Sequence, residues 1–521
     1  MSGLGFWRLA EADPAARAVV GPDGSVLTRG ELAALSNRVA RLLRAGGLAR
    51  GDRVVAVPSN EPAVLALVLA CQQAGAYFVP VNTALTTPEI AHILRDAGPA
   101  AVFASAEYTG RVREAVSESG TACPHLFASG PADGFQDLAE AAAPFGPSPL
   151  EDRAAGSFMG YTSGTTGRPK GVMRGLPEGD PDDVFGRGAE WQLGMFGIEP
   201  LKDGVHLVTS PLSHTAVSGL ALASLHFGHT VVLTSRFDAE ETLRIVQRER
   251  VTTTHMVPTQ LHRLLRLPEE VRGACDVSSM RTLIHGAGPC PPEVKRQIID
   301  WFGPVVVEYY GATEAAGTVA TSREWLDRPG TVGRPQPGAE VRILDDEGRL
   351  LPAGEPGRVF LGMGAHAFEY RNDPDKTRSG RSGDFVTVGD LGYLDEDGYL
   401  FLLGRTSEVV VSGGVNVYPA EVEAAILEHP DVVDVGVIGL PDPEWGHTVC
   451  AVVQAVPGSV LAGGARAGEI LPDFLASRLA RFKTPRRYLV VDALPRGANG
   501  KLRKHLLTEM AGARTDEGGR P

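Results

Sequence analysis

Short apolar runs rich in valine, isoleucine and leucine recur along the first two-thirds of the chain, and stretches with helical spacing separate many of them. Residues 52–58, 78–81 and 101–104 are such runs, with helix-like segments at 62–76 and 87–97 between them. Strands that are continuously apolar are typical of parallel sheets covered by helices on both faces. The pattern resumes at residues 206–210, 230–234, 253–257, 282–284 and 305–309. The sequence therefore predicts an α/β fold and not a bundle or a sandwich.

The residue composition and the pattern of apolar runs change twice in the last third of the chain. After about residue 331, Gly, Pro and Asp become frequent, and short alternating runs at 340–344, 357–361 and 398–402 predict a small, β-barrel-like antiparallel part. Beyond residue 405, strands near 408–411, 434–439, 449–456 and 488–491 and helices at 419–429 and 471–480 predict a separate α+β unit that ends near residue 507. We predict a large domain over residues 1–404, a hinge at 405–408, a small mobile domain at 409–510 and a disordered tail at 511–521.

Composition narrows the class of protein. The net charge of −13 argues against a broad nucleic-acid surface, although a local site can still be positive and bind an anion. The five cysteines form no C-x-x-C pair, which favours free thiols in a reducing compartment. Residues 204–235 carry no charged side chain, but their proline and four histidines favour a buried helix and strand over a membrane span. No signal peptide is visible, and we expect a soluble, cytoplasmic protein.

The sharpest local motif is Tyr-Thr-Ser-Gly-Thr-Thr-Gly-Arg-Pro-Lys-Gly-Val at residues 161–172. Gly164 and Gly167 let backbone N–H groups point into one concavity, and the Ser and Thr hydroxyls add further donors. Lys170 places a mobile cation beside them, so the segment is suited to hold a polyanion such as a phosphate chain. The order G-x-x-x-x-G-K-[ST] of a Walker A loop is absent.

With this motif, the chain resembles the ANL superfamily of adenylating enzymes, which includes acyl-CoA synthetases, luciferases and peptide-synthetase adenylation domains. The resemblance covers roughly residues 25–505 and includes a Tyr-Gly-x-Thr-Glu signature at 310–314. Gly389-Asp390, Gly404-Arg405 and Lys501, within the segment 495–503, follow in the family's order. The resemblance implies ATP, Mg²⁺ and coenzyme A as ligands, and a carboxylic acid as the substrate.

Each matched position has a chemical role in joining a carboxylate to AMP, where two anions must be brought together and pyrophosphate must leave. Glu314 is suited to hold Mg²⁺, and Thr313 to donate to the α-phosphate. Tyr310 offers a flat face to adenine and Glu308 an acceptor for its amino group, while Asp390 is suited to accept from ribose and Arg405 adds charge-assisted contacts. The predicted nucleotide and coenzyme residues are Thr162, Ser163, Gly164, Thr165, Thr166, Gly167, Lys170, Gly286, Ala287, Gly288, Glu308, Tyr309, Tyr310, Gly311, Ala312, Asp390, Arg405, Gly413 and Gly414.

The resemblance also implies that the two half-reactions use different parts of the small domain. Lys501 would reach into the large domain and stabilise charge during adenylation. The small domain would then rotate about residues 405–408 and bring in the glycine loop at Gly413 and Gly414, whose bare backbone permits close approach of the pantetheine arm. Ser407 and Glu408 stand where many relatives carry Lys and Asp, so the balance between the two half-reactions is left open.

His214 resembles the family's aromatic or His position beside the acyl carboxylate, and a gating or steering role suits it because the carboxylate is already ionised at neutral pH. Residues 216–224 are mostly small and predict room for a substrate. The local motifs are similar to those of ligases for steroid or terpenoid acids, and we therefore expect a bulky, largely apolar acid.

Other readings stay open at this point. The protein could carry out only one half-reaction together with a partner enzyme, or load a carrier-protein thiol in place of coenzyme A. A non-catalytic nucleotide-binding module is a different class, and the joint presence of Lys170, Glu314, Asp390, Arg405 and Lys501 argues against it. A homodimer is also compatible with the sequence.

Overall fold

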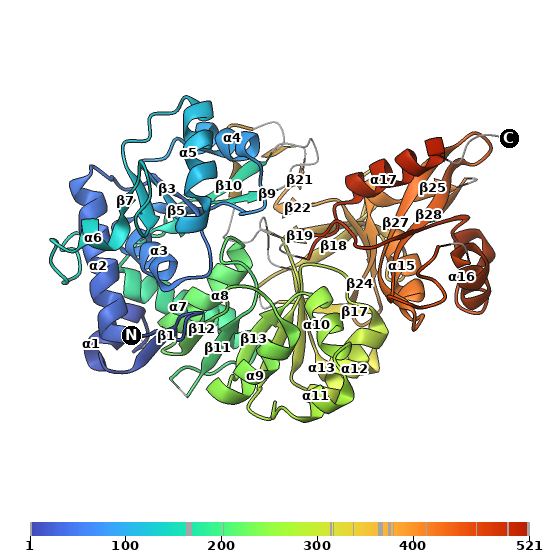
Figure 1. The fold of residues 1–521 in the computed structure, drawn as a ribbon, viewed down its shortest axis with the longest axis horizontal. Coiled ribbons are helices and arrows are strands. Elements are labelled where there is room, and N and C mark those ends of the chain that lie inside the picture. The colour runs from blue at the N-terminus through green and yellow to red at the C-terminus, as the bar shows by residue number, and fades with distance from the viewer. Residues whose placement is uncertain are drawn as a thin grey trace.

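The computed structural model describes residues 3–162, 169–201, 203–312, 315, 317–336, 338–362, 368–373, 377–378, 380–412, 414–464, 466–497 and 500–517. The large domain and the small C-terminal domain lie side by side, with the small domain at the C-terminal, orange-to-red end of the ribbon (Figure 1). Helix-covered sheets form most of the large domain, and the small domain is α+β, as the sequence predicts.

The first sheet of the large domain is entirely parallel, in the order β7-β6-β5-β3-β4-β8. Its strands are β3 (Arg53–Val57), β4 (Tyr77–Pro80), β5 (Ala101–Ser105), β6 (Leu126–Ser129), β7 (Gln136–Asp137) and β8 (Ser157–Phe158). Alternate residues of β3 pack into two different cores. Val54 and Ala56 join the core under α2 (Arg29–Ala45) and α3 (Pro62–Ala74), while Val55 and Val57 join the core under α4 (Thr87–Ala97) and α5 (Thr109–Ser119). The sheet is therefore buried on both faces, which explains its unbroken apolar runs.

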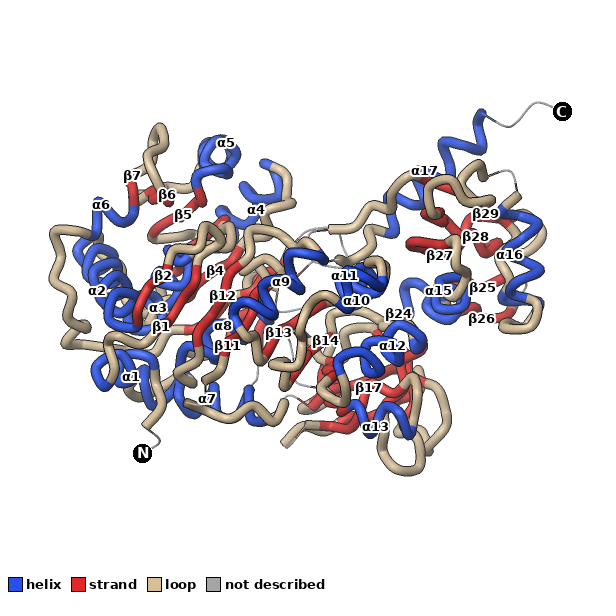
Figure 2. Tube along the Cα trace, turned by 60° about the horizontal axis from the view of Figure 1, so that its bottom comes forward, coloured by secondary structure: helices blue, strands red, loops and turns tan. Residues whose placement is uncertain are grey.

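The second sheet begins with parallel strands in the order β1-β12-β11-β13-β14-β15. These are β1 (Arg17–Val20), β11 (Val205–Val208), β12 (Thr230–Leu233), β13 (Thr253–Met256), β14 (Thr282–His285) and β15 (Val306–Tyr310), with β2 (Val26–Thr28) at the edge. The helices between or beside them are α1 (Phe6–Ala12), α7 (Pro181–Gly194), α8 (Thr215–His226), α9 (Ala239–Glu249), α10 (Pro258–Leu265), α11 (Glu269–Gly273) and α12 (Pro292–Phe302). The short helix α6 (Leu138–Ala142) packs against β6 and β7 of the first sheet. Strands, red in Figure 2, run through the middle of the large domain with helices on either side.

The part predicted to be barrel-like continues this second sheet with antiparallel strands. They are β16 (Thr318–Thr321), β17 (Thr331–Pro335), β18 (Val341–Leu344), β19 (Gly357–Gly362), β21 (Arg381–Ser382), β22 (Phe385–Val386), β23 (Asp390–Leu394) and β24 (Leu400–Arg405), with the helix α13 (Ser322–Asp327). A separate three-stranded sheet holds β9 (Gly160–Thr162), β10 (Lys170–Arg174) and β20 (Phe368–Tyr370). The hairpin of β9 and β10 thus flanks the glycine-rich motif.

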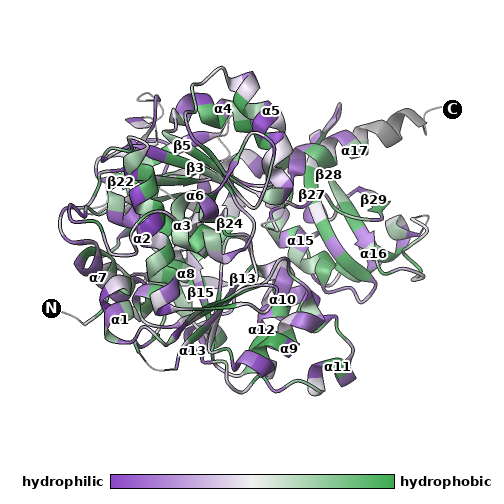
Figure 3. Ribbon diagram, turned by 60° about the vertical axis from the view of Figure 1, so that its left-hand side comes forward, coloured by the Kyte–Doolittle hydropathy of each residue, from purple (hydrophilic) through white to green (hydrophobic). Residues whose placement is uncertain are grey.

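The small domain is built on a long antiparallel pair, β27 (Val432–Asp442) and β28 (Gly446–Ala455). The remaining elements are β25 (Val410–Ser412), β26 (Val415–Val417), β29 (Arg487–Val491), α15 (Pro419–Leu427), α16 (Ala467–Leu475) and α17 (Lys504–Glu517). Hydrophobic residues gather on central strands such as β3, β5 and β28, and hydrophilic residues lie on the outer helices (Figure 3).

Two helices of the small domain differ from the sequence-based prediction. α16 begins four residues earlier than the predicted 471–480, because Ala467, Leu471 and Leu475 form its buried face. α17 continues through residues 511–517, which the sequence assigned to a disordered tail. Leu507 and Ala511, one helical turn apart, are both buried against β27 and β28, and this contact explains why the helix extends.

The uncharged stretch 204–235 folds into β11, α8 and β12, in agreement with the buried helix and strand that were predicted. Among the described residues, no helix combines the length and hydropathy needed to cross a membrane.

Candidate active site between the two domains

A cleft of about 2700 Å³ lies between the large domain and the small domain and is lined by residues of both. Arg266 of the large domain donates to the carbonyl oxygen of Pro430 across the boundary, over 3.3 Å. Most of the predicted site residues that the structure describes meet in this cleft. They are Lys170, His214, Ala287, Gly288, Glu308, Tyr309, Tyr310, Gly311, Ala312, Asp390, Arg405 and Lys501.

Several predicted residues cannot be placed. Ser163, Gly164, Thr165, Thr166, Gly167, Thr313, Glu314 and Gly413 lie outside the described residues, and Thr162 is described only in its backbone. The predicted Mg²⁺ ligand, Glu314, is among them. Gly286 lies just behind the cleft, where a side chain would collide with Tyr309. Gly414 turns the hairpin between β25 and β26 and does not belong to the cleft lining.

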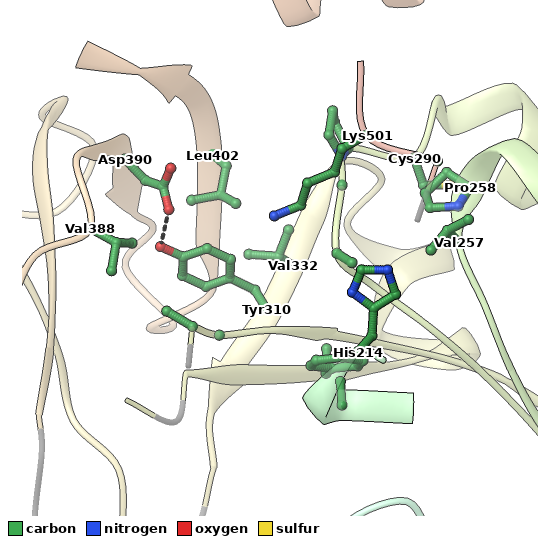
Figure 4. A pocket seen from close by; sticks show the side chains of 18 of the residues that line it. His214, Val257, Pro258, Cys290, Tyr310, Val332, Val388, Asp390, Leu402 and Lys501 are labelled. Atoms are coloured by element: carbon green, nitrogen blue, oxygen red, sulfur yellow. Dashed lines mark hydrogen bonds between the residues drawn. The ribbon is translucent and has the colours of Figure 1, made fainter. Parts of the chain in front are cut away.

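Lys501 enters the cleft from a tight turn of the small domain. Figure 4 shows its ammonium group pointing into the space between Tyr310 and His214. Arg496 holds the turn in place, because its guanidinium donates to both carboxylate oxygens of Asp434 at 2.6 and 2.7 Å and to the carbonyl oxygen of Gly500 at 2.8 Å. At Gly500, φ is +73° and an added Cβ would lie 2.6 Å from the Thr259 hydroxyl. Glycine therefore lets the turn approach the large domain closely.

Tyr310 and Asp390 form a second wall of the cleft. The Tyr310 hydroxyl donates to Asp390 over 2.7 Å (Figure 4). The Arg405 guanidinium lies 3.2 Å from the other oxygen of the same carboxylate. Asp390 and Arg405 are direct partners in the pairing of β23 with β24, so the sheet register brings them together. Burial and the neighbouring Asp390 carboxylate raise the pKa of Tyr310, which therefore keeps its proton.

Glu308 is paired with a buried cation that the sequence did not identify as a site residue. Lys295 donates to its carboxylate over 2.6 Å, and neither side chain is more than 8% exposed. Burial raises the pKa of Glu308 while Lys295 opposes that shift, and burial together with Lys295 lowers the pKa of His285 well below its usual range. Lys295 lies on the apolar face of α12, so a lysine among buried Val294, Ile298 and Ile299 was the available signal.

Asp96, at the end of α4, anchors both the strand that precedes the glycine-rich motif and the segment that follows β20. Tyr161 donates to its carboxylate over 2.6 Å, and Asn372 donates to the other oxygen over 2.8 Å. Lys170 forms an ion pair with Asp373. The motif's basic end is thus fixed at the cleft wall, where Lys170 is a lining residue.

One part of the cleft wall, formed by α7 and α8, is largely apolar. It includes Trp191, Met195 and Phe196 from the α7 region and Val217 and Leu220 from α8. Most of the small residues of α8 predicted to make room for a substrate are instead buried in the protein interior, including those at 221–224. His214 lies at the N-terminus of this helix, and burial and the charge of Lys501 lower its pKa to about 4.

Glu408 in the predicted hinge is held by the small domain. Lys504 lies 2.9 Å from Glu408 and 3.1 Å from Glu423 of α15. The two carboxylates raise the pKa of Lys504 and keep it charged despite its burial. No local pattern predicts this cluster, because its members come from three separate segments.

Comparisons with known proteins agree with this geometry. Residues 6–369 match the family described as AMP-binding enzyme, and residues 421–501 match the AMP-binding enzyme C-terminal domain. The chain is 35% identical over 512 residues to a feruloyl-CoA synthase from Amycolatopsis sp, and the aligned region covers 96% of this chain and 98% of that protein. It is 33% identical over 515 residues to ScoC, a fatty acid–[acyl-carrier-protein] ligase from Streptomyces coeruleorubidus. This aligned region covers 96% of this chain and 94% of ScoC.

The fold is similar to that of a solved structure as well. The amide bond synthetase McbA from Marinactinospora thermotolerans superposes with a TM-score of 0.82 at 27% identity, over 97% of this chain and 99% of that one. Family, sequence and structure therefore point the same way as the cleft. This chain belongs to the ANL superfamily of AMP-binding enzymes, within its family of ATP-dependent, AMP-forming acid–thiol ligases.

Proposed function

We propose that this protein is an acyl-CoA synthetase that joins a bulky, largely apolar carboxylic acid to AMP and then transfers the acyl group to the thiol of coenzyme A. One observation carries the proposal. Lys501 of the small domain lies in the cleft with Tyr310, Asp390 and His214, while Gly414 of the same domain lies outside its lining. The two groups proposed for the two half-reactions therefore cannot act from one arrangement of the domains.

In the first half-reaction, an oxygen of the acid attacks the α-phosphorus of ATP and the bond to pyrophosphate breaks. The acid needs no general base, because a carboxylate is already ionised at neutral pH. Lys501 supplies positive charge where the two anions meet, which is the kind of electrostatic stabilisation that lowers such a barrier most. His214 is neutral at this pH, because burial lowers its pKa. Its role is therefore to restrict the shape of the cleft where the apolar wall ends.

In the second half-reaction, the thiolate sulfur attacks the acyl carbon and AMP leaves with the electron pair of the broken C–O bond. Gly414 has φ of +81°, and an added side chain would meet open space in the present arrangement. This exposed backbone supports a role that begins only when the small domain has rotated and Lys501 has withdrawn. Family members that form CoA thioesters use ATP, Mg²⁺ and CoA.

The apolar wall supports the proposed acid. Trp191, Met195, Phe196 and Leu220 offer a large hydrophobic surface next to His214, which suits a bulky hydrocarbon body behind a carboxylate. A carrier protein or an amine is the alternative acceptor, in view of the names of ScoC and McbA. A homodimer and a partner enzyme stay predictions. Five free thiols support our proposal of a cytoplasmic location.

The test separates the two half-reactions. Acid-dependent exchange of pyrophosphate into ATP measures the first, and thioester formation from synthetic acyl-adenylate measures the second. We expect Lys501→Ala to slow exchange by about 100-fold or more, as loss of one preorganised donor does elsewhere, and to leave the second step within a few-fold. Lys501→Arg should recover part of the exchange.

Gly414→Trp should show the reverse pattern, with exchange retained and thioester formation lost. Gly458 is a matched control, because it also has positive φ and open space around it in the small domain, and Gly458→Trp should leave both steps intact. Equal losses in both steps for Lys501→Ala would contradict the proposed role. If the protein catalyses exchange and transfers the acyl group to a carrier protein or an amine but not to CoA, that molecule would replace CoA as the proposed acceptor.

A further inference from the structure

The two arms of the glycine-rich motif are held from a single helix. β9 carries Tyr161 and β10 begins at Lys170, and the two strands pair antiparallel with Gly171 opposite Tyr161. Tyr161, Pro169 and Lys170 all line the cleft. Helix α4 packs against β10 (Figure 1). The helix is therefore placed to fix both arms at once.

His92 and Asp96 of α4 each contact one arm. Nε2 of His92 lies 3.1 Å from the carbonyl oxygen of Pro169. A carbonyl oxygen can only accept, so His92 carries a hydrogen on Nε2 and donates it. The Tyr161 hydroxyl donates to Asp96 over 2.6 Å, and burial together with this hydrogen bond raises the pKa of Tyr161, so the phenol keeps its hydrogen. Because His92 and Asp96 are four residues apart, they share one face of the helix.

Asp96 also holds the segment that pairs with Lys170. Asn372 donates to the second carboxylate oxygen of Asp96 over 2.8 Å, and Arg371 donates to its backbone carbonyl over 2.7 Å. The next residue, Asp373, forms the ion pair with Lys170. Asp96 is therefore connected both to the start of the motif and to the counter-ion of its lysine.

The rest of α4 is fixed in the core of the large domain. Ile90, Leu94 and Ala97 are buried and belong to the same hydrophobic cluster as Val55 of β3 and Val79 of β4. Groups supported by a packed helix are placed more precisely than groups on a loop alone. His92 and Asp96, which both lie in the described part of the chain, are not part of the cleft lining, so any effect they have on a ligand passes through the motif.

We propose that His92 and Asp96 are positioning residues for ATP, which hold the arms of the glycine-rich motif where its amides and Lys170 meet the phosphate chain. The inference rests on the proposed function and adds to it two residues that no motif identifies. The β- and γ-phosphates leave as pyrophosphate in the first half-reaction. The two residues therefore matter for ATP and not for an acyl-adenylate that has already formed.

The affinity of the full-length protein for ATP tests the proposal. It is measured as KM for ATP in pyrophosphate exchange and as Kd for ATP in titration calorimetry. We expect Asp96→Ala to raise both constants by about tenfold or more, because a small displacement of a positioned group is costly, and to leave KM for the acid unchanged. Thioester formation from synthetic acyl-adenylate should also be unchanged, whereas a variant that is merely misfolded would lose it.

Two further variants examine the contacts one at a time. Tyr161→Phe should raise KM for ATP in the same direction, and adding it to Asp96→Ala should have little further effect, because substitutions of residues in contact are not additive. His92→Ala should raise KM for ATP as well. His92→Gln should restore it, since the amide can donate to the Pro169 carbonyl in place of the imidazole.

Asp238→Ala is the matched control. Asp238 also makes a side-chain hydrogen bond in the large domain, where it accepts from the backbone N–H of Glu241 over 2.9 Å at the start of α9, and it is not part of the cleft lining. This variant should keep the wild-type KM and Kd for ATP even though it loses a hydrogen bond.

Each outcome is decisive. Unchanged KM and Kd for ATP in Asp96→Ala, or equal losses in exchange and in thioester formation, would overturn the inference. If Asp96→Ala does not fold, Tyr161→Phe and His92→Ala take its place, and unchanged ATP affinity in both would overturn the inference. A wild-type protein that binds ATP more tightly than these variants but catalyses no exchange with any acid would overturn the proposed function and leave the inference standing.

Discussion

Lys295 and Glu308 illustrate how one residue can depend on another for its charge. Lys295 is completely buried and lies over the Trp325 ring, with its nitrogen 5.0 Å from the ring centroid. A buried charge without a partner is far more costly than a buried pair. Glu308 therefore stays an acceptor at neutral pH because Lys295 is beside it, which suits the proposed contact of Glu308 with the amino group of adenine.

We predict that Lys295→Met raises KM for ATP by about tenfold, in line with the loss of about 1.4 kcal/mol of binding. The unpaired Glu308 would take up a proton and donate where it should accept, so the preference for ATP over GTP should fall as well. Raising the pH should restore part of the ATP binding, because a carboxyl whose pKa is raised by burial loses its proton more readily at higher pH. Steady-state kinetics with both nucleotides measure these effects.

Arg296→Met is the control for that experiment. Its guanidinium also lies over the Trp325 ring, at 5.7 Å, but the side chain is exposed and does not contact Glu308. It should keep the wild-type KM and nucleotide preference. A Lys295→Met variant with unchanged KM for ATP and unchanged preference for ATP over GTP would show that Glu308 does not recognise the amino group of adenine.

At the scale of an element, α17 connects the packing of the small domain to the position of Lys501. The helix starts three residues after Lys501, and Lys504 in its first turn bonds to Glu408 and Glu423. Leu507 is fully buried among Ile438, Leu494 and their neighbours. The helix therefore fixes the segment that carries Lys501, and residues at the far end of the chain contribute to the active site.

We predict that Leu507→Ala destabilises the small domain by about 2–5 kcal/mol, the usual cost of removing a buried leucine side chain. Faster hydrogen exchange in β27 and β28, and a lower midpoint of the small-domain transition in calorimetry, would report it. Pyrophosphate exchange should fall steeply at temperatures above that midpoint. Glu509→Ala, an exposed position on the same helix, should change none of these values, and an unchanged midpoint for Leu507→Ala would contradict the packing argument.

At the scale of the whole molecule, the two domains meet mainly around the cleft. The contact of Arg266 with Pro430 and the approach of Gly500 to Thr259 lie at its rim. Figure 2 shows the small domain set beside the large one, joined to it after β24. Among the described residues, the polar contacts across the boundary include that of Arg266 with Pro430, and we propose that the small domain rotates about the hinge at 405–408.

Buried imidazoles predict how the stability of the whole protein depends on pH. Burial is the main cause that lowers the pKa of His206 and His226 to about 3 and that of His214 and His255 to about 4. These groups bind protons in the unfolded chain below about pH 6.5 but not in the folded one, so stability falls as the pH falls below that value. Lowering the pH from about 6.5 to about 5.5 should cost about 1 kcal/mol per histidine.

Thermal unfolding at both pH values checks this prediction, and we expect a midpoint that is lower by several degrees at the lower pH. Glu61 and Glu308 oppose the effect, because burial raises the pKa of each carboxyl, but they are fewer. His206→Gln should reduce the pH dependence over this interval by about 1 kcal/mol. A midpoint that stays constant or rises on acidification would contradict the prediction.

The α/β architecture and the location of the site were predictable from local patterns. Helix α4 was predicted at its observed bounds, and apolar runs indicated the central strands within one or two residues, because burial on both faces is visible in the composition of a strand. The motifs at 161–172, 310–314, 390, 405 and 501 contain residues that line the cleft, among them Lys170, Tyr310, Asp390 and Lys501.

Contacts between distant segments depended on the tertiary structure alone. His255 and Tyr309 are 54 residues apart and meet only because β13, β14 and β15 are neighbours in the sheet. The pairing of Lys295 with Glu308, the burial of the small residues of α8 and the extension of α17 have the same origin. Local periodicity decides which residues form an element, since backbone hydrogen bonds and side-chain spacing act over a few positions. Sheet order and packing decide which side chains become neighbours, and therefore what the cleft can recognise.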